Sequence, residues 1–277
     1  MVKIVSWNIN GIRGKSMDLF DNNNFNYNSH LGSLIKDKKP DIICFSETKC
    51  QDKNINTFAW PKNENGEDLY PYTCWNCSQI KKGYSGVAVL SKLPFNNLGS
   101  IPTLEDDHEG RSLVLQYDDF LLITVYTPNS GTKSEYRQIW DCQVKQYLQS
   151  LLDLEIPVVY CGDLNVVHQP HDIYDSKIWY GEKHCGVLGY EKKGMCDILE
   201  TGYIDAWRYF NPIKPNEDDC QKKYTWWNPR VKARMRGIGW RIDYFVIREK
   251  DTNRIKEVDI LDNVLGSDHC PIYLELI

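Results

Sequence analysis

The chain has 277 residues, of which 42% are hydrophobic and 26% are charged, and these proportions exclude a disordered or fibrous protein. A formal net charge of −5 argues against a protein whose whole surface is basic and binds nucleic acid non-specifically. One segment departs from this average, because residues 222–241 carry Lys and Arg, no acidic residue, and Tyr and Trp between the cations. We therefore expect one globular domain over residues 1–277, mildly acidic, with one basic and aromatic segment.

Short runs of β-branched and aromatic residues predict strands, in chain order, at 3–7, 41–47, 86–91, 112–117, 120–126, 157–163, 241–247 and 271–277. Asp118 and Asp119 separate two of these runs and predict a tight β-hairpin. Helical periodicity predicts helices over 30–38, over 134–152 and around 192–202. Many strands lie too close in sequence for parallel crossovers, which favours mixed sheets packed face to face with helices outside.

The ten cysteines raise the question of disulfides. The chain starts directly with "VKIVSW", and no run approaches the roughly 20 apolar residues of a membrane span. We therefore expect an intracellular protein with free thiols, in the nucleus or the cytoplasm, that is neither secreted nor in the membrane. Cys74 and Cys77 resemble half of a zinc site, but no second ligand pair at suitable spacing is evident.

Polar side chains recur where the predicted strands end. Taken one at a time, each is explained as a turn former or a helix cap. If the strand ends converge at one edge of packed sheets, however, their carboxylates come close together, and a divalent cation would relieve the repulsion. Carboxylate oxygens with water are the ligands that Mg²⁺ prefers. The residues are Asn8, Asn10, Glu47, Tyr126, Asn129, Asp163, Asn165, Asp243, Asp268 and His269.

The motifs "SWNINGIRG", "ICFSETKC", "YTPNSG", "GDLNVVH", "GWRIDYF" and "GSDHCPI" occur in this order over nearly the whole chain. In this the sequence resembles the exonuclease III and apurinic/apyrimidinic (AP) endonuclease family, within the endonuclease/exonuclease/phosphatase superfamily. The resemblance implies a four-layered α/β-β/α sandwich of two mixed sheets flanked by helices. It also implies metal-assisted attack of water on the phosphodiester 5′ to an abasic site, which leaves a 3′-OH and a 5′-deoxyribose phosphate. The expected cofactor is Mg²⁺, with Mn²⁺ as a substitute, and 3′-phosphodiesterase or 3′–5′ exonuclease activity is expected as well.

The resemblance assigns roles to these residues. Glu47 is the expected metal ligand, with Asn10 and Asp268 near the ion, and Asp163, Asn165 and His269 are further candidates for it. Asp163 is expected to orient or deprotonate the attacking water. The residues expected to contact the scissile phosphate are Asn8, Tyr126, Asn165 and His269. Asp243 is expected to hold His269 in position. No Ser or Cys is placed as a nucleophile, which favours direct attack by water.

The same resemblance implies that the basic, aromatic segment binds DNA and the abasic sugar. Trp226, Trp240 and Ile242 match positions that line a pocket for a flipped-out abasic sugar, although Trp226 and Trp227 can also be read as core residues. Arg230 matches a position that inserts into the duplex, and it can equally be a phosphate contact. Further DNA contacts are expected from Arg13, Lys49, Asn129, Lys232 and Arg234.

At two positions the residue type differs from that of some family members. Asn10 stands where some have Asp, and Thr132 stands where some have a basic residue that faces DNA. The expected partner is duplex DNA with abasic sites or blocked 3′ ends, bound by a monomer. A phosphatase or phospholipase of the superfamily is the alternative enzyme, but it should lack the aromatic pocket. A DNA-binding protein without catalysis should have lost some of the site residues, and all are present.

Overall fold

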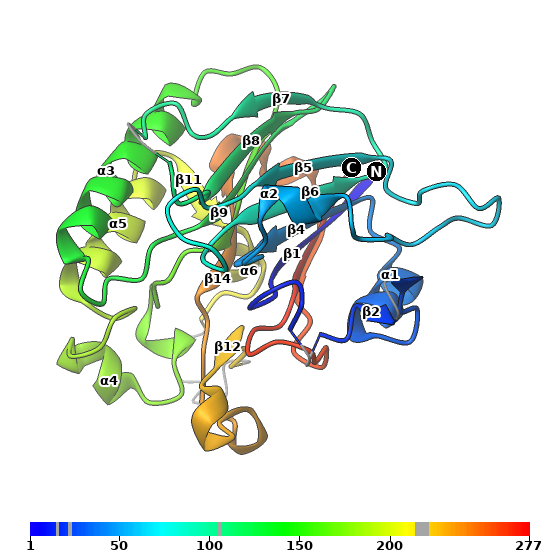
Figure 1. Cartoon of the computed structure of the whole chain (residues 1–277). Helices are drawn as coiled ribbons and strands as arrows, with labels where there is room; N and C mark the ends of the chain where they lie inside the picture. Colours follow the sequence, from blue (N-terminus) through cyan, green and yellow to red (C-terminus); the bar gives the residue numbers. More distant parts are fainter. Residues whose placement is uncertain (15–16, 22–23, 105–106, 214–221) are drawn as a thin grey trace.

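The computed structural model describes residues 1–14, 17–21, 24–104, 107–213 and 222–277, and two six-stranded sheets form its centre (Figure 1). The first sheet has the order β15 (Ile255–Ile260), β16 (Ile272–Leu276), β1 (Val2–Asn8), β4 (Ile42–Ser46), β6 (Val87–Ser91), β5 (Tyr72–Asn76). The second has the order β11 (Tyr203–Asp205), β14 (Asp243–Arg248), β10 (Val158–Asp163), β9 (Leu121–Tyr126), β8 (Ser112–Gln116), β7 (Asn96–Gly99). Both sheets are mixed, because β1 and β4, and likewise β9 and β10, run parallel within otherwise antiparallel sheets.

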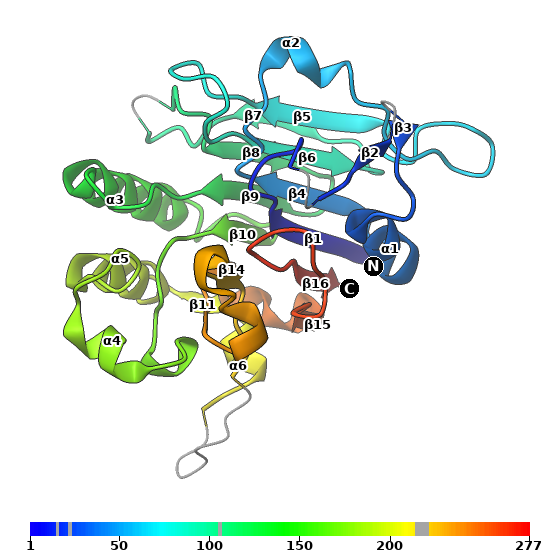
Figure 2. The same ribbon diagram turned by 60° about the horizontal axis from the view of Figure 1, so that its bottom comes forward.

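Helices α1 (His30–Lys38), α3 (Ser134–Ser150) and α5 (Gly189–Leu199) pack on the outer faces of the two sheets. The further, short helices of the described residues are α2 (Asp52–Ile55), α4 (Ser176–Gly181) and α6 (Ala206–Phe210), with 3₁₀ helices η1 (Pro170–Asp172), η2 (Pro229–Val231), η3 (Arg234–Arg236) and η4 (Glu249–Arg254). Figure 2 shows α1 on one side of the sheets and α3 and α5 on the other. Small two-stranded ribbons join β2 (Phe20–Asp21) to β3 (Asn24–Phe25) and β12 (Trp226–Trp227) to β13 (Gly239–Trp240).

The core is layered as the strand periodicity requires. In β1, Ile4 belongs to the apolar cluster between the two sheets, whereas its neighbour Val5 belongs to the outer cluster that includes Leu31 of α1. Successive side chains of a strand point to opposite faces, so both faces of a central strand must be apolar. On the second sheet, Trp140 of α3 and Met195 of α5 complete the other outer cluster. This helix–sheet–sheet–helix arrangement confirms the predicted four-layered sandwich.

Strand pairing brings the polar strand ends to one edge. The parallel partners β1 and β4 end side by side, with Asn8 opposite Ser46. In the second sheet Asp163 lies opposite both Tyr126 of β9 and Asp243 of β14. The ends predicted from sequence to converge therefore do converge.

Gly162 makes this arrangement possible. Its φ is +137°, and a Cβ atom there would lie 2.0 Å from the carbonyl oxygen of Val125 on β9. Any larger residue would push β10 away from β9 next to Asp163. The glycine in "CGDLN" is thus a structural requirement of the site.

All eight predicted strands and all three predicted helices are present, and the hairpin at Asp118 and Asp119 joins β8 to β9. The strands that were not predicted in the large sheets are β5, β7, β11 and β15, and each is an edge strand. Edge strands are short and half-exposed, so their sequences are polar and lack the apolar signal. Within the described residues, none of the helices combines the length and hydrophobicity that crossing a bilayer requires.

Candidate active site

A cavity of about 230 Å³ opens at the edge where the strands end. Most of the residues predicted for catalysis and for the sugar pocket line this one cavity. They are Glu47, Tyr126, Asn129, Asp163, Asn165, Trp226, Trp240, Ile242, Asp268 and His269. Cys185 and Gly186 also line it, and neither was predicted, because no motif of the sequence marks them.

Asp163 lies at the bottom of the site and is 2% exposed. Its Oδ2 accepts a hydrogen bond from Asn8 Nδ2 at 2.9 Å, and its Oδ1 accepts one from the backbone N–H of Asn165, also at 2.9 Å. Burial, together with the nearby charge of Asp243, raises the pKa of Asp163 to about 7. The carboxylate is therefore held rigidly and is basic enough to accept a proton near neutral pH.

His269 lies between the two acids of the second sheet. Its Nδ1 is 2.8 Å from Asp243 Oδ2, and its Nε2 is 3.9 Å from Asp163 Oδ2. Burial alone would lower the pKa of His269, but the charge of Asp243 and the hydrogen bond to it outweigh burial and raise the pKa to about 10. The imidazole is thus a cation at neutral pH, with Asp243 fixing its orientation.

Two buried arginines, Arg111 and Arg137, support the site, and neither role was predicted from the sequence. Arg111 Nη1 donates to the carbonyl of Tyr126 at 2.9 Å, and its guanidinium carbon lies 4.7 Å from the centre of the Tyr126 ring. Arg137 of α3 donates to the carbonyls of Leu164 and Asn165 at 3.0 and 3.2 Å. These contacts fix the phenol and the turn that carries Asn165, whose φ is +48°.

Glu47 and Asp268 supply carboxylates at the rim of the cavity. Lys49 Nζ lies 3.0 Å from Glu47 Oε1 and also bonds Asn10 Oδ1, while Asn10 Nδ2 donates to Asp268 Oδ1 at 3.0 Å. Glu47, Lys49 and Asn10 all have φ near +50°, so the backbone is bent to present them. Two carboxylates and an amide oxygen beside the cavity are a donor set that fits a hard divalent cation.

The deeper group offers a second possible donor set. One ligand atom each from Asp163, Asp243 and His269 lie within 4.8 Å of one another, so this group could hold a metal. It contains an imidazole that is already bonded to Asp243, whereas the rim set is made of oxygen ligands alone. The chemistry of the rim set therefore suits Mg²⁺ better.

The aromatic wall of the cavity comes from β12 and β13. The rings of Trp226 and Trp240 meet edge to face, with centroids 5.5 Å apart and an angle of 72°. Trp227 faces the other way and is 6% exposed, so this tryptophan is a core residue. Ile242 adds apolar surface to the same wall.

The basic segment divides into exposed and anchored cations. Arg230 and Lys232 are exposed, as expected of DNA contacts. Arg234 instead stacks on Trp227, at 4.2 Å from the ring centre, and donates to the carbonyls of Asp262, Val264 and Ser267. Its guanidinium is turned inward, which departs from the prediction of a phosphate contact, and it anchors the segment to the loop before His269.

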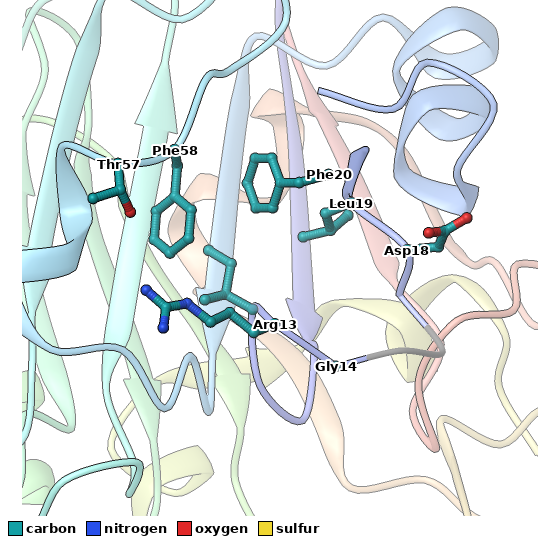
Figure 3. Close-up of a pocket in the computed structure, with 8 residues that line it drawn as sticks. Arg13, Gly14, Asp18, Leu19, Phe20, Thr57 and Phe58 are labelled. Atoms are coloured by element: carbon teal, nitrogen blue, oxygen red, sulfur yellow. The ribbon is translucent and has the colours of Figure 1, made fainter. Parts of the chain in front are cut away.

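Arg13 lies apart from the cavity. It lines a separate pocket of about 540 Å³, where its guanidinium carbon is 5.6 Å from the centre of the Phe58 ring. Figure 3 shows Phe20 and Phe58 facing one another above Arg13. Arg13 is exposed and remains available to a ligand that extends beyond the catalytic cavity.

Comparison with known proteins agrees with this geometry. Residues 5–269 match the Endonuclease/Exonuclease/phosphatase family. The chain is 37% identical to an exodeoxyribonuclease of Bacillus subtilis, over 99% of this chain and 98% of the relative. It is 33% identical to a DNA-(apurinic or apyrimidinic site) endonuclease of Dictyostelium discoideum, over 98% of this chain and 69% of the relative.

A solved structure shares the fold. The AP endonuclease LMAP of Leishmania major superposes with a TM-score of 0.78, over 99% of this chain and 86% of that chain, at 23% identity. The chain therefore belongs to the Endonuclease/Exonuclease/phosphatase family, in the exonuclease III and AP endonuclease branch that its motifs predicted.

Proposed function

We propose that this protein is a DNA-repair endonuclease that hydrolyses the phosphodiester 5′ to an abasic site in duplex DNA, leaving a 3′-OH and a 5′-deoxyribose phosphate. One observation carries the proposal: the aromatic wall of Trp226 and Trp240 and the network of Asp163 and His269 line the same cavity. A baseless sugar is easily extruded from the duplex and fits such a pocket, whereas an intact nucleotide is excluded. The bond to be cut then lies beside the catalytic groups.

The chain's own residues support hydrolysis by water. Asp163 orients the water and accepts its proton, because the raised pKa makes this carboxylate a base near neutral pH. The His269 imidazolium neutralises charge on the nonbridging phosphate oxygens, and Asp243 keeps it charged. Tyr126, Asn165 and Asn8 line or support the same pocket as hydrogen-bonding groups for the phosphate.

The cofactor is Mg²⁺, with Mn²⁺ as a substitute. Glu47 would be its main ligand, with Asp268 and Asn10 beside it, and Lys49, which pairs with Glu47 in this structure, would contact DNA phosphate. When bound, the ion supplies charge that stabilises the leaving oxygen. Asp163, Asn165 and His269 contact water and phosphate, so in this assignment they are not the primary ligands.

Duplex DNA with abasic sites or blocked 3′ ends is the proposed partner. Arg230 and Lys232 contact phosphate or enter the duplex, Asn129 contacts the strand at the cavity, and Arg13 contacts it farther along. We propose that residues 1–277 work as one monomeric catalytic domain, inside the cell where its DNA substrate lies. The names of the B. subtilis and D. discoideum relatives support an exonuclease activity and an abasic-site activity respectively.

The experiment compares two duplexes that are identical except for one synthetic abasic site, each incubated with Mg²⁺ and with EDTA. We expect incision of the abasic duplex only, and only with the metal. Trp226→Ala and Trp240→Ala should lower the preference for the abasic duplex, because a wider pocket admits an intact nucleotide. Equal cutting of both duplexes by the wild type, or none by either, would refute the proposed substrate.

A further inference from the structure

The carboxylate of Asp268 is held by donors on both of its oxygens. Asn10 Nδ2 and Ser267 Oγ donate to Oδ1, at 3.0 and 3.2 Å. Trp226 Nε1 donates to Oδ2 at 3.2 Å. Together these bonds fix the direction in which Asp268 faces the rim of the cavity.

Trp226 therefore has two contacts of different kinds. Its ring forms the wall of the cavity against Trp240, and its indole N–H reaches the carboxylate of Asp268. Its backbone is fixed on both sides, because Trp226 pairs with Trp240 in the β12–β13 ribbon and forms a bridge with His269. Next to it, the N–H of Trp227 donates to the carbonyl of Asp268 at 3.0 Å. The pocket wall and the loop carrying Asp268 are thus one connected unit.

We propose that Trp226 is a positioning residue for the metal site: its indole N–H sets the orientation of Asp268, so the wall that receives the abasic sugar also prepares the carboxylate beside the metal. This inference rests on the proposed function, which places Asp268 next to Mg²⁺. Any shift of the Trp226 ring on sugar entry is transmitted to Asp268 through one hydrogen bond. Recognition of the lesion and binding of the metal are therefore coupled.

The change Trp226→Phe separates the two contacts. Phenylalanine keeps an aromatic ring in the wall but has no N–H, so Oδ2 of Asp268 loses its protein donor. Partners that orient metal ligands typically contribute tenfold or more to metal affinity, so we expect Mg²⁺ binding to weaken by about tenfold. Preference for the abasic duplex should stay close to that of the wild type. Trp226→Ala removes the ring as well as the donor, so it should weaken Mg²⁺ binding and also lower the preference for the abasic duplex.

The test is isothermal titration of Mg²⁺ into DNA-free wild type, Trp226→Phe and Trp240→Phe. Trp240→Phe is the matched control, because it makes the same change on the facing wall at a tryptophan that does not hold Asp268. We expect weaker binding for Trp226→Phe and wild-type binding for Trp240→Phe, with all three proteins folded in thermal melts. Unchanged Mg²⁺ affinity in Trp226→Phe would overturn the proposal, and so would an equal loss in both variants.

An Asp268→Asn background makes the test independent of any general change in packing. If Trp226 acts through Asp268, adding Trp226→Phe to Asp268→Asn should weaken Mg²⁺ binding no further. Additive losses would contradict the proposal. The titrations contain no DNA, so a failure of the proposed substrate would appear separately, as a lack of incision of the abasic duplex by a protein that still shows this metal coupling.

Discussion

Two buried clusters of charged side chains lie on either side of Ile242, and they differ in charge balance. The first contains two acids and two guanidinium groups, and the second contains two acids and one imidazole. In the first, Arg241 Nε and Nη2 bond both oxygens of Asp172 at 2.9 and 2.8 Å, and Nη2 also bonds Asp205 at 2.6 Å. The members are Asp172, Asp205, Arg208 and Arg241 in the balanced cluster, and Asp163, Asp243 and His269 in the acidic one.

Asp172 and Asp163 are both buried, yet their pKa values move in opposite directions. Burial would raise the pKa of Asp172, but Arg241 and Arg208 outweigh it and hold the pKa below its usual range. At Asp163 burial prevails, helped by the charge of Asp243, and the pKa rises to about 7. Full compensation gives a group that stays ionised and holds elements together, whereas incomplete compensation gives a base suited to catalysis.

The largest expected effect is at Asp163. Asp163→Asn removes the base and keeps the shape, although its one amide oxygen can accept only one of the bonds from Asn8 Nδ2 and the Asn165 N–H, so turnover should fall by about 10²–10⁴-fold. In EDTA the variant should unfold at the same temperature as the wild type or a higher one, because a penalised buried charge is gone. Single-turnover incision measures the rate, and thermal melts measure the unfolding temperature. A clear loss of stability would indicate that Asp163 has a structural role.

The same change in the balanced cluster should act in the opposite way. Asp172→Asn leaves Arg241 and Arg208 with incomplete partners, which should lower the free energy of unfolding by about 3–5 kcal/mol. Turnover per folded molecule should stay near that of the wild type. The control is Asp118→Asn at the exposed β8–β9 turn, which we expect to change neither property. A variant of Asp172 that is stable but inactive would show that this cluster also takes part in catalysis.

Stability measured at several pH values in EDTA should distinguish Asp163 from Asp172. The folded pKa of Asp163 lies above its unfolded value of about 3.9, so stability from this group falls as the pH rises from about 4 to about 7. Asp172 is the reverse, because its lowered pKa gives stability that is lost as the pH falls through the acid range. We expect Asp163→Asn to be more stable than the wild type by roughly 2 kcal/mol at pH 7.5, and by much less at pH 4.5. Denaturant titrations at the two pH values measure this, and an equal difference at both would contradict the assigned pKa.

The acidic cluster could be predicted from the sequence because Asp163 ends a strand, Asp243 begins one and His269 shortly precedes one. The apolar runs placed the central strands, and Asp163 and His269 stood out as polar groups against them. The balanced cluster was not foreseen, since Arg241 was counted with the basic segment and only the fold brings it to Asp172 from 69 residues away. The inward turn of Arg234 was missed for the same reason, because a charge in the sequence does not say which way its side chain points.

The smallest expected effects separate exposed from anchored cations. Lys232→Ala should weaken binding to damaged and undamaged duplexes alike and reduce the salt dependence by about one charge, with no change in stability. Arg234→Ala should lower stability by about 1 kcal/mol, because it removes a ring contact and three bonds to carbonyls. Binding titrations at several salt concentrations, with matched melts, measure both. If Arg234→Ala instead weakened duplex binding and left stability unchanged, Arg234 would be a DNA contact.

The most direct test of the proposed chemistry is the identity of the ends left on a labelled duplex with one abasic site. With Mg²⁺, the wild type should leave a 3′-OH that a DNA polymerase extends at once, and neither EDTA nor Asp163→Asn should allow this product to form. A cut on the 3′ side that leaves an unsaturated aldehyde and persists in EDTA would contradict hydrolysis by the Asp163 and His269 site.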